Sequence, residues 1–326
     1  MDNVNVYITG NILEVFWMNE TCVKVKNLYK YFEDVKAIDG MSFEVETGTI
    51  FGLLGPNGAG KTTTIENLIG LISRDSGQID ILGYDPGEDN EKLQEKIGVQ
   101  LQSPTLFDKL TVKEIVSLFA SFYNNPFPIK EAIEMVGLNS KNDDYVESLS
   151  GGQKHRLAVA LAIVSNGEII FLDEPTTGLD PQSRRKVWSV IKKLKQLGKT
   201  IFMTTHYMDE AENLCDQLLI IDQGKVLVRG KPAELIEKHF EVDMIEFENT
   251  TFIEEEIGAL ASLESVTGQK LDKNENIILY TVDAVQTIAG LLAFSEKAGK
   301  PIRKLNLRKP TLEDLFLKLT GKEIRE

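Results

Sequence analysis

A glycine-rich loop between an apolar run and a helical pattern constrains the fold of this 326-residue chain more than any other feature. The loop spans residues 55–62 and reads Gly-Pro-Asn-Gly-Ala-Gly-Lys-Thr, which fits the pattern G-x-x-x-x-G-K-[ST] in full. Residues 49–54 before it are apolar and strand-sized, and residues 61–73 after it place their apolar side chains on one helical face. A buried strand that leads through such a loop into a helix is typical of α/β proteins, in which ligands bind at the carboxyl ends of the strands.

The residue types of this loop predict a phosphate site. Successive backbone N–H groups would surround the α and β phosphates of a nucleotide, Lys61 would reach the β and γ phosphates, and Thr62 would ligate Mg²⁺. A glycine-rich turn that only caps the helix would leave the lysine and the threonine unexplained. The candidate nucleotide-binding residues are therefore Gly55, Pro56, Asn57, Gly58, Ala59, Gly60, Lys61, Thr62 and Thr63.

Two adjacent carboxylates follow another apolar run, residues 168–172. Asp173 is expected at the carboxyl end of this parallel strand, where it could hold Mg²⁺ through water, and Glu174 could polarise an attacking water. Two carboxylates can also simply mark a strand that leaves the core, but the phosphate-binding loop favours the catalytic interpretation. His206 follows the strand-like residues 200–205 and is expected at the same edge, the alternative being a hydrogen-bonded loop histidine.

The segment 149–153, Leu-Ser-Gly-Gly-Gln, precedes residues 154–166, whose apolar side chains recur at helical spacing. Its glycines are therefore expected at a helix N-terminus, where unpaired N–H groups and the helix dipole favour anions. Ser150 adds a hydroxyl donor, although an N-capping serine before an ordinary helix explains the segment when it is taken alone. Asp180 before Pro181 also has a structural explanation, because Asp followed by Pro begins many helices.

The composition limits the class of partner. A formal net charge of -14 fits poorly with nucleic acid, because proteins that bind its phosphate backbone usually present a basic face. No apolar run approaches the roughly 20 residues that cross a bilayer, so a function in membranes would need a separate spanning chain. Cys22 and Cys215 lack metal-ligand spacing and are expected to be reduced thiols in the cytosol.

The pattern of elements divides the chain into three parts. Residues 1–20 are expected to be an extension, either non-native with Met18 as the functional start or poorly ordered, because the folded pattern begins after Met18. Residues 21–235 begin with two expected edge strands, at 23–26 and 41–45. They then contain strand, helix and strand in the order of a parallel sheet, with a mainly helical insertion at about 104–166. Residues 241–326 alternate short strands with helices and hold no cluster of catalytic residue types, so we expect a small accessory or regulatory α/β domain.

These ordered motifs resemble those of ABC transporter ATP-binding subunits. Residues 55–62 resemble the Walker A motif, and residues 169–173 resemble Walker B, with Glu174 as the general base. Residues 149–153 match the family's signature motif, and residues 177–180 match its D-loop. The resemblance covers the whole of the middle part of the chain. It implies a P-loop NTPase core of the RecA-like type, with an antiparallel β edge and a helical subdomain.

The same resemblance implies roles for further residues. Gln102 resembles the Q-loop glutamine that senses the γ phosphate and the membrane partner, and the Ser-Pro pair after it favours it over Gln100. His206 resembles the switch histidine that contacts the γ phosphate. Phe32 is the best match to the aromatic residue that stacks on adenine, and Tyr31 is its rival. The implied metal ligands are Thr62, Gln102 and Asp173.

The family also implies a dimer, either a homodimer or a pair of ATPase subunits, in which ATP and Mg²⁺ lie between two head-to-tail domains. Ligand held only in the closed state would drive closure, and hydrolysis would reverse it. A separate transmembrane permease would carry the substrate, so this chain would be a cytoplasmic protein on the cytoplasmic face of the membrane. The residues implied to act across the interface are Ser150, Gly151, Gly152, Gln153 and Asp180, and those implied in hydrolysis are Glu174, His206, Lys61 and Gln102.

Residues 310–321, with the α/β region before them, resemble the C-terminal end of the drug-resistance branch of ABC-2-type exporter ATPases, which implies export. A helix that is capped by Thr311 and stopped by Gly321 accounts for the same residues. The competing function is a soluble ABC ATPase that acts on nucleic acid or ribosomes. It is disfavoured by the acidic balance and by the lack of a coiled-coil-sized insertion between Lys61 and Asp173.

Overall fold

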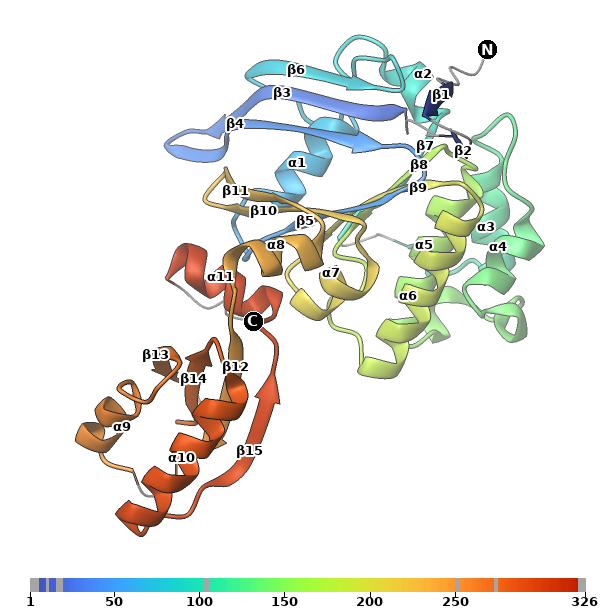
Figure 1. The fold of residues 1–326 in the computed structure, drawn as a ribbon. Coiled ribbons are helices and arrows are strands. Elements are labelled where there is room, and N and C mark those ends of the chain that lie inside the picture. The colour runs from blue at the N-terminus through green and yellow to red at the C-terminus, as the bar shows by residue number, and fades with distance from the viewer. Residues whose placement is uncertain are drawn as a thin grey trace. The chain divides into compact units, whose positions relative to one another are not determined.

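The computed structural model of this protein describes residues 6–9, 12–15, 20–102, 106–249, 252–272 and 275–321. The expected start at Met18 lies outside these residues, and so does the Ser103-Pro104 pair that favours Gln102 over Gln100 as the Q-loop glutamine. Two compact units follow one another along the chain, the first ending at Pro232 and the second beginning at Ala233 (Figure 1). Near the N-terminus, β1 (Val6–Thr9) and β2 (Ile12–Val15) pair as antiparallel strands.

A six-stranded sheet is the centre of the first unit (Figure 1). Its order is β11-β10-β5-β9-β8-β7, in which β11 is antiparallel to β10 and every other neighbouring pair is parallel. The strands β5, β8 and β9 are buried along their whole length, which is why they read as apolar or β-branched runs. The strands are β5 (Ile50–Leu54), β7 (Ile97–Gln100), β8 (Ile169–Asp173), β9 (Thr200–Thr205), β10 (Gln217–Asp222) and β11 (Lys225–Gly230).

The predicted antiparallel β edge is a three-stranded sheet of order β4-β3-β6. Its strands are β3 (Thr21–Phe32), β4 (Val35–Glu46) and β6 (Ser76–Ile81). β3 and β4 are much longer than the expected segments 23–26 and 41–45. The pairing shifts register after Val25, and Asn27 has a φ of 47°, so the regular alternation that marks a strand in sequence is interrupted there. Phe43 of this sheet stacks on Phe51 of β5 with 5.5 Å between ring centroids, which joins the two sheets in one core.

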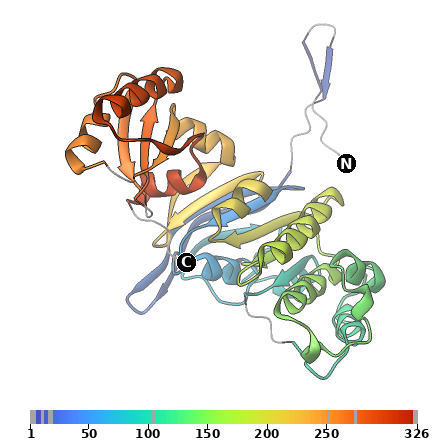
Figure 2. The ribbon, with the colours of Figure 1, turned by 90° about the horizontal axis from the view of Figure 1, so that it is seen from below.

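The helices of the first unit fall into two groups. α3 and α4 pack against α5, and in both views these three helices lie together beside the parallel sheet (Figures 1 and 2). The other helices connect the strands. α1 stops short of the expected segment 61–73, because the chain reaches Gly70 with a φ of 71°. The helices are α1 (Lys61–Leu68), α2 (Asn90–Gln94), α3 (Val112–Ala120), α4 (Ile129–Met135), α5 (Gly151–Val164), α6 (Pro181–Gln196) and α7 (Met208–Leu214), followed at the unit boundary by α8 (Pro232–His239).

The second unit is a four-stranded antiparallel sheet of order β13-β14-β12-β15 with helices in the sequence βαββαβ. This order is that of a ferredoxin-like fold. One face of the sheet packs its apolar side chains, among them Ile245, Phe247 and Leu279, with Leu260 of α9 and Leu291 of α10. The elements are β12 (Asp243–Glu248), α9 (Glu254–Leu260), β13 (Val266–Leu271), β14 (Ile277–Thr281), α10 (Ala284–Ala298), β15 (Arg303–Arg308) and α11 (Leu312–Thr320).

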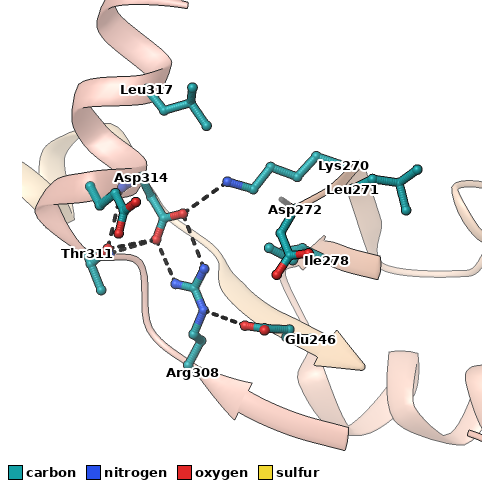
Figure 3. A pocket seen from close by; sticks show the side chains of 10 residues that line it. Glu246, Lys270, Leu271, Asp272, Ile278, Arg308, Thr311, Asp314 and Leu317 are labelled. Carbon is teal, nitrogen blue, oxygen red and sulfur yellow. Dashed lines mark hydrogen bonds and ion pairs between the residues drawn. The ribbon is translucent and has the colours of Figure 1, made fainter. Parts of the chain in front are cut away.

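The last helix, α11, is tied to this sheet by a buried carboxylate (Figure 3). Asp314 accepts hydrogen bonds from Arg308 Nη1 at 2.6 Å and from Lys270 Nζ at 3.2 Å. Thr311 caps the helix, as the sequence alone suggests, and its backbone N–H and hydroxyl both donate to Asp314 at 3.0 Å. Arg308 also reaches Glu246 through Nε at 3.1 Å. Burial raises the pKa of Asp314, but Arg308 and these hydrogen bonds outweigh it and keep the pKa below its ordinary value.

Arg308→Ala is expected to destabilise the second unit by about 3 kcal/mol or more, because it leaves the buried Asp314 carboxylate without its main partner. The matched control is Lys304→Ala on the same strand. Lys304 forms an ion pair with Glu248 on the surface, so its loss should lower the free energy of unfolding by less than about 1 kcal/mol. Hydrogen exchange of β15 and α11 measures both changes. Equal effects of the two substitutions would contradict the role given to Arg308.

Candidate nucleotide-binding and catalytic site

The glycine-rich loop, residues 55–60, joins the buried strand β5 to helix α1. Gly60 has a φ of 103°, and a Cβ added there would lie 2.2 Å from the carbonyl oxygen of Ala37, so only glycine fits. The N–H of Gly55 donates to the carbonyl oxygen of Thr205 at 3.3 Å, which fixes the start of the loop to the end of β9. All nine predicted nucleotide-binding residues thus lie in this loop or in the first turn of α1.

Lys61 is buried, and its ammonium group folds back onto the loop. Its Nζ donates to the carbonyl oxygens of Gly55 at 2.9 Å and Pro56 at 3.0 Å, and it lies 3.0 Å from Glu174 Oε1. An ammonium group has three N–H donors, so these contacts use all of them. A phosphate that binds Lys61 must therefore exchange with at least one of these three partners.

Glu174 is the point at which the expected catalytic residues meet. Besides Lys61, its carboxylate accepts hydrogen bonds from Gln102 Nε2 at 3.1 Å and Thr177 Oγ1 at 3.0 Å, and it lies 3.2 Å from His206 Nδ1. Burial raises the pKa of Glu174, but His206 and the Lys61 ammonium outweigh it and lower the pKa to about 2. The residue has a φ of 47°, an uncommon conformation for a non-glycine residue that turns the chain sharply after β8.

Asp173 lies beside it at the end of β8 and is fully buried. One carboxylate oxygen, Oδ1, accepts a hydrogen bond from the hydroxyl of Thr204, which in turn accepts the N–H of Glu174 at 2.9 Å. The other oxygen, Oδ2, is buried without a hydrogen-bond partner. Burial raises the pKa of Asp173, and hydrogen bonds from Thr204 and Thr62 oppose this rise. A buried acceptor without a partner is costly, so Oδ2 is an acceptor that a ligand could use.

The structure separates the two candidate glutamines. Gln100 is the last residue of β7 and is buried, with its amide donating to the carbonyl oxygens of Leu101 at 2.7 Å and Asp173 at 3.3 Å. Gln102 lies beyond the strand end, and its side chain reaches Glu174. Among the two, Gln102 alone therefore contacts the carboxylate expected to act as base.

The two candidate adenine-stacking rings are both exposed near the end of the β3–β4 hairpin. Phe32 is the more exposed, at 46% against 38% for Tyr31. The Lys30 ammonium lies 5.2 Å from the centre of the Phe32 ring, and Lys36 lies 5.9 Å from that of Tyr31. Both rings are thus available to a base at the surface, and Phe32 remains the candidate taken from the sequence.

Ser150 and Asp180 both act as helix caps, as their structural explanations suggest. Ser150 and Gln153 form a capping box at the start of α5, in which the Ser150 N–H donates to Gln153 Oε1 at 2.7 Å. Asp180 accepts the N–H groups of Gln182 and Ser183 at the start of α6, at 2.9 and 3.0 Å. Gly151 is exposed, and a Cβ placed on it would meet no atom within 4 Å. The N-terminus of α5 is therefore open on that side.

Two threonines that hold these carboxylates are not among the site residues predicted from the sequence. Thr204 bridges Asp173 and the backbone of Glu174, and Thr177 holds the Glu174 carboxylate. The Thr204-Thr205 pair at the end of the strand before His206 was the available signal, because hydroxyl groups at that edge can bond to neighbouring strand ends. Thr177 gave no such signal, because its contact depends on the sharp turn at Glu174.

The comparisons with known proteins agree with this geometry. A family model described as ABC transporter matches residues 38–177. The Nod factor export ATP-binding protein I of Ralstonia nicotianae is 36% identical over 310 residues, covering 93% of this chain and 95% of that protein. The chain belongs to the ABC transporter family. The protein of the same name from Rhizobium sp. strain N33 is 38% identical to this ABC protein over 315 residues, which is 95% of this chain and 100% of that one.

Solved structures of ABC proteins share the fold. The cbiO1 protein of Clostridium perfringens, described as part of the ABC transporter complex cbiONQ, has a TM-score of 0.60 and 30% identity, covering 67% of this chain and 92% of its own. The cassette MJ0796, described as dimeric, has a TM-score of 0.58 and 27% identity, covering 64% of this chain and 98% of its own. These matches confirm the predicted P-loop fold and the predicted family. This chain is an ABC transporter ATP-binding subunit, and it is an ATPase.

Proposed function

We propose that this subunit powers export through a separate membrane permease, as an ABC-2-type ATPase that closes into a head-to-tail dimer when it binds ATP. The observation that carries this proposal is the set of contacts at Glu174, where Lys61, Gln102, Thr177 and His206 converge on one carboxylate. These residues come from four segments that are far apart in the chain. A carboxylate held in this way at the ends of parallel strands is suited to position a water for attack on a phosphate.

The Lys61–Glu174 ion pair suggests how nucleotide binding prepares the base. A γ phosphate that takes over the Lys61 ammonium removes a positive partner from Glu174, so the pKa of Glu174 rises from about 2 toward its ordinary value. A carboxylate with the higher pKa accepts a proton from water more readily. His206 stays beside the same carboxylate and can hold it, or donate to the phosphate, as the water attacks.

The residues present fit a magnesium ion bound together with the phosphates. Asp173 offers a buried carboxylate oxygen without a partner, and Thr62 offers a hydroxyl in the first turn of α1. Gln102 is the third candidate ligand, through its amide oxygen. The ion would neutralise charge on the phosphate oxygens. Within the described residues no cluster of three or more His, Cys, Asp or Glu side chains could hold a metal by itself, so the phosphates would have to complete this site.

The open N-terminus of α5 supports a role for the signature segment across the dimer interface. The capping box holds Ser150 and Gln153 against each other, and the N–H groups of Gly151 and Gly152 lie in the first turn, where an anion is stabilised. A Cβ on Gly152 would lie 3.0 Å from Ser183 Oγ, so the segment packs closely on α6, which Asp180 begins. We propose that both segments face the ATP bound by the other subunit.

Mixed dimers test whether the site is shared. Lys61→Ala and Ser150→Arg are each placed in subunits that carry Glu174→Gln, and dimers with one of each are purified through two tags. One site of such a dimer keeps Lys61 from one subunit and Ser150 from the other, so about one ATP per dimer should be retained, against about two in the Glu174→Gln parent. Loss of all ATP from the mixed dimer would show that Lys61 and Ser150 act within one chain.

The proposed permease contact uses the helical insertion. Four large apolar side chains are exposed there, and they lie on the part of the chain that follows Gln102. No helix among the described residues is long and apolar enough to span a bilayer. The relatives named for export support a chain that is bound to a spanning partner at the cytoplasmic face. The exposed side chains are Phe107, Leu118, Phe122 and Tyr145.

Export is favoured over the soluble alternative because both relatives described above are named for export, and because the acidic chain fits poorly with nucleic acid. Purification of the native protein from detergent extracts tests this choice. A stoichiometric membrane protein with several spans is expected as partner. Recovery with ribosomes or DNA in its place would favour the alternative.

A further inference from the structure

Glu210 is a buried carboxylate that none of the motifs uses. It lies in the first turn of α7 and is fully buried. Its Oε1 accepts two hydrogen bonds, one from the hydroxyl of Thr176 at 2.8 Å and one from the indole N–H of Trp188 at 2.8 Å. Its Oε2 is buried without a hydrogen-bond partner. A carboxyl group in this position is costly to the fold, so its presence suggests that its contacts serve function.

The partners of Glu210 lie next to the catalytic side chains. Thr176 is in the turn that begins at Glu174, so Glu210 holds the segment that carries the expected base. Glu210 itself lies four residues after His206, in the helix that follows the end of β9. Glu210 therefore joins the loop after β8 to the loop after β9, and these two loops supply the contact between Glu174 and His206.

Trp188 connects the same carboxylate to α6. This helix begins at the cap residue Asp180, which we place at the dimer interface. A second contact joins the same two helices, because the Arg184 guanidinium lies 4.1 Å from the centre of the Tyr207 ring and donates to Asp209 at 3.2 Å. The Tyr207 ring in turn lies 4.1 Å from the ring of His206, measured between centroids. α6 is thus connected to the segment that carries His206 by two sets of contacts.

We propose that Glu210 is a positioning residue that links α6 to Glu174 and His206, so that the arrival of the partner subunit at Asp180 aligns the base and the histidine for hydrolysis. This inference rests on the proposed function, in which Glu174 activates water and Asp180 faces the partner. In the described part of the chain, Glu210 forms no hydrogen bond or ion pair with the glycine-rich loop or with Glu174. It acts through its hydrogen bonds with Thr176 and Trp188 and through its place on α7, just after His206 and Tyr207.

The hydrogen bonds of this network can be removed one at a time or together. Trp188→Phe removes the indole N–H, Thr176→Val removes the hydroxyl, and Glu210→Leu removes both acceptors. Each is expected to lower the kcat of the intact dimeric ATPase by about tenfold or more, since small misplacements of catalytic groups have effects of this size. The KM for ATP should stay within about twofold, because no contact to the phosphates is changed. Glu210→Gln keeps the Oε1 acceptor and should restore at least about half of the wild-type kcat.

Two controls separate positioning from plain loss of stability. Ile191→Val shortens a buried side chain of α6 that has no part in the network. It should lower the melting temperature, but at temperatures below the melting transition it should leave kcat unchanged. Glu210→Leu combined with Trp188→Phe should be no slower than Glu210→Leu alone, because both changes remove the same link.

Three results would overturn the inference: wild-type kcat in the folded Glu210→Leu variant, wild-type kcat in both Trp188→Phe and Thr176→Val, or a Glu210→Gln variant as slow as Glu210→Leu. If Glu210→Leu does not fold, the two single-bond variants decide alone. The proposed function is judged separately, because it fails if Glu174→Gln hydrolyses ATP normally. The inference fails by itself if Glu174→Gln is inactive while the Glu210 network variants are fully active.

Discussion

Glu174→Gln is expected to bind ATP and to form the closed dimer, yet to hydrolyse ATP about a hundredfold more slowly or worse. The amide keeps the size of the side chain and one oxygen near Lys61, but it cannot accept the proton of the attacking water. Loss of a transition-state interaction of about 3 kcal/mol corresponds to a rate loss of this size. Phosphate release measures hydrolysis, and gel filtration with ATP measures the dimer.

Glu168→Gln is the matched control for that result, because Glu168 precedes the same strand at its other end. It pairs with Lys96 on the surface, where the two side chains are 56% and 45% exposed. Its loss should leave hydrolysis within about twofold of the wild-type rate, since exposed ion pairs contribute little. Turnover in Glu174→Gln equal to that of this control would remove Glu174 from the role of base.

Lys61→Ala is expected to weaken ATP binding by about ten- to a hundredfold and to abolish measurable hydrolysis, since a charge-assisted hydrogen bond contributes roughly 1.5–3 kcal/mol. The substitution also leaves the buried Glu174 without its ammonium partner. Titration calorimetry with ATP measures the affinity. Lys96→Ala, which removes a surface lysine, provides the control and should bind ATP like the wild type.

The same variant has a signature in acid. The pKa of Glu174 in the folded protein is about 2, below its ordinary value of 4.5, so its contacts stabilise the fold above pH 4.5 and lose this effect as the pH falls toward 2. Without Lys61 the pKa of Glu174 should lie closer to 4.5, and the stability should depend less on pH in this window. A pH dependence equal to that of the wild type would contradict the pairing of Lys61 with Glu174.

The loop and both carboxylates could be predicted because their residue types and their neighbours along the chain are sufficient. Gln102 is a different case, since Gln100 has the same side chain and only the end of β7 separates their environments. Glu210 could not be found from the sequence at all. Its carboxylate meets Thr176 and Trp188, which are distant in sequence, and nothing near it in the chain marks it as buried.

The lengths of β3 and β4 and the strand order of the second sheet could not be predicted from the sequence, for physical reasons. β3 continues past Asn27, and β4 begins before Met41, because backbone pairing resumes after the register shift although the alternation of side chains does not. In the second unit, β15 pairs with β12, and the chain between these strands contains two helices and two other strands. Strand propensity predicts that such strands exist, but it does not predict which of them become neighbours.

The position of Lys61 between two carbonyl oxygens and Glu174 affects the rate of product release. Because the ammonium has protein partners of its own, phosphate must compete with Glu174 for it, and the net affinity is the difference between two similar attractions. When phosphate leaves, the Glu174 carboxylate can pair with Lys61 again, so the buried Lys61 ammonium is not left without a partner. Glu174, which is expected to activate water for hydrolysis, is thus also placed to displace phosphate from Lys61 before the next turnover.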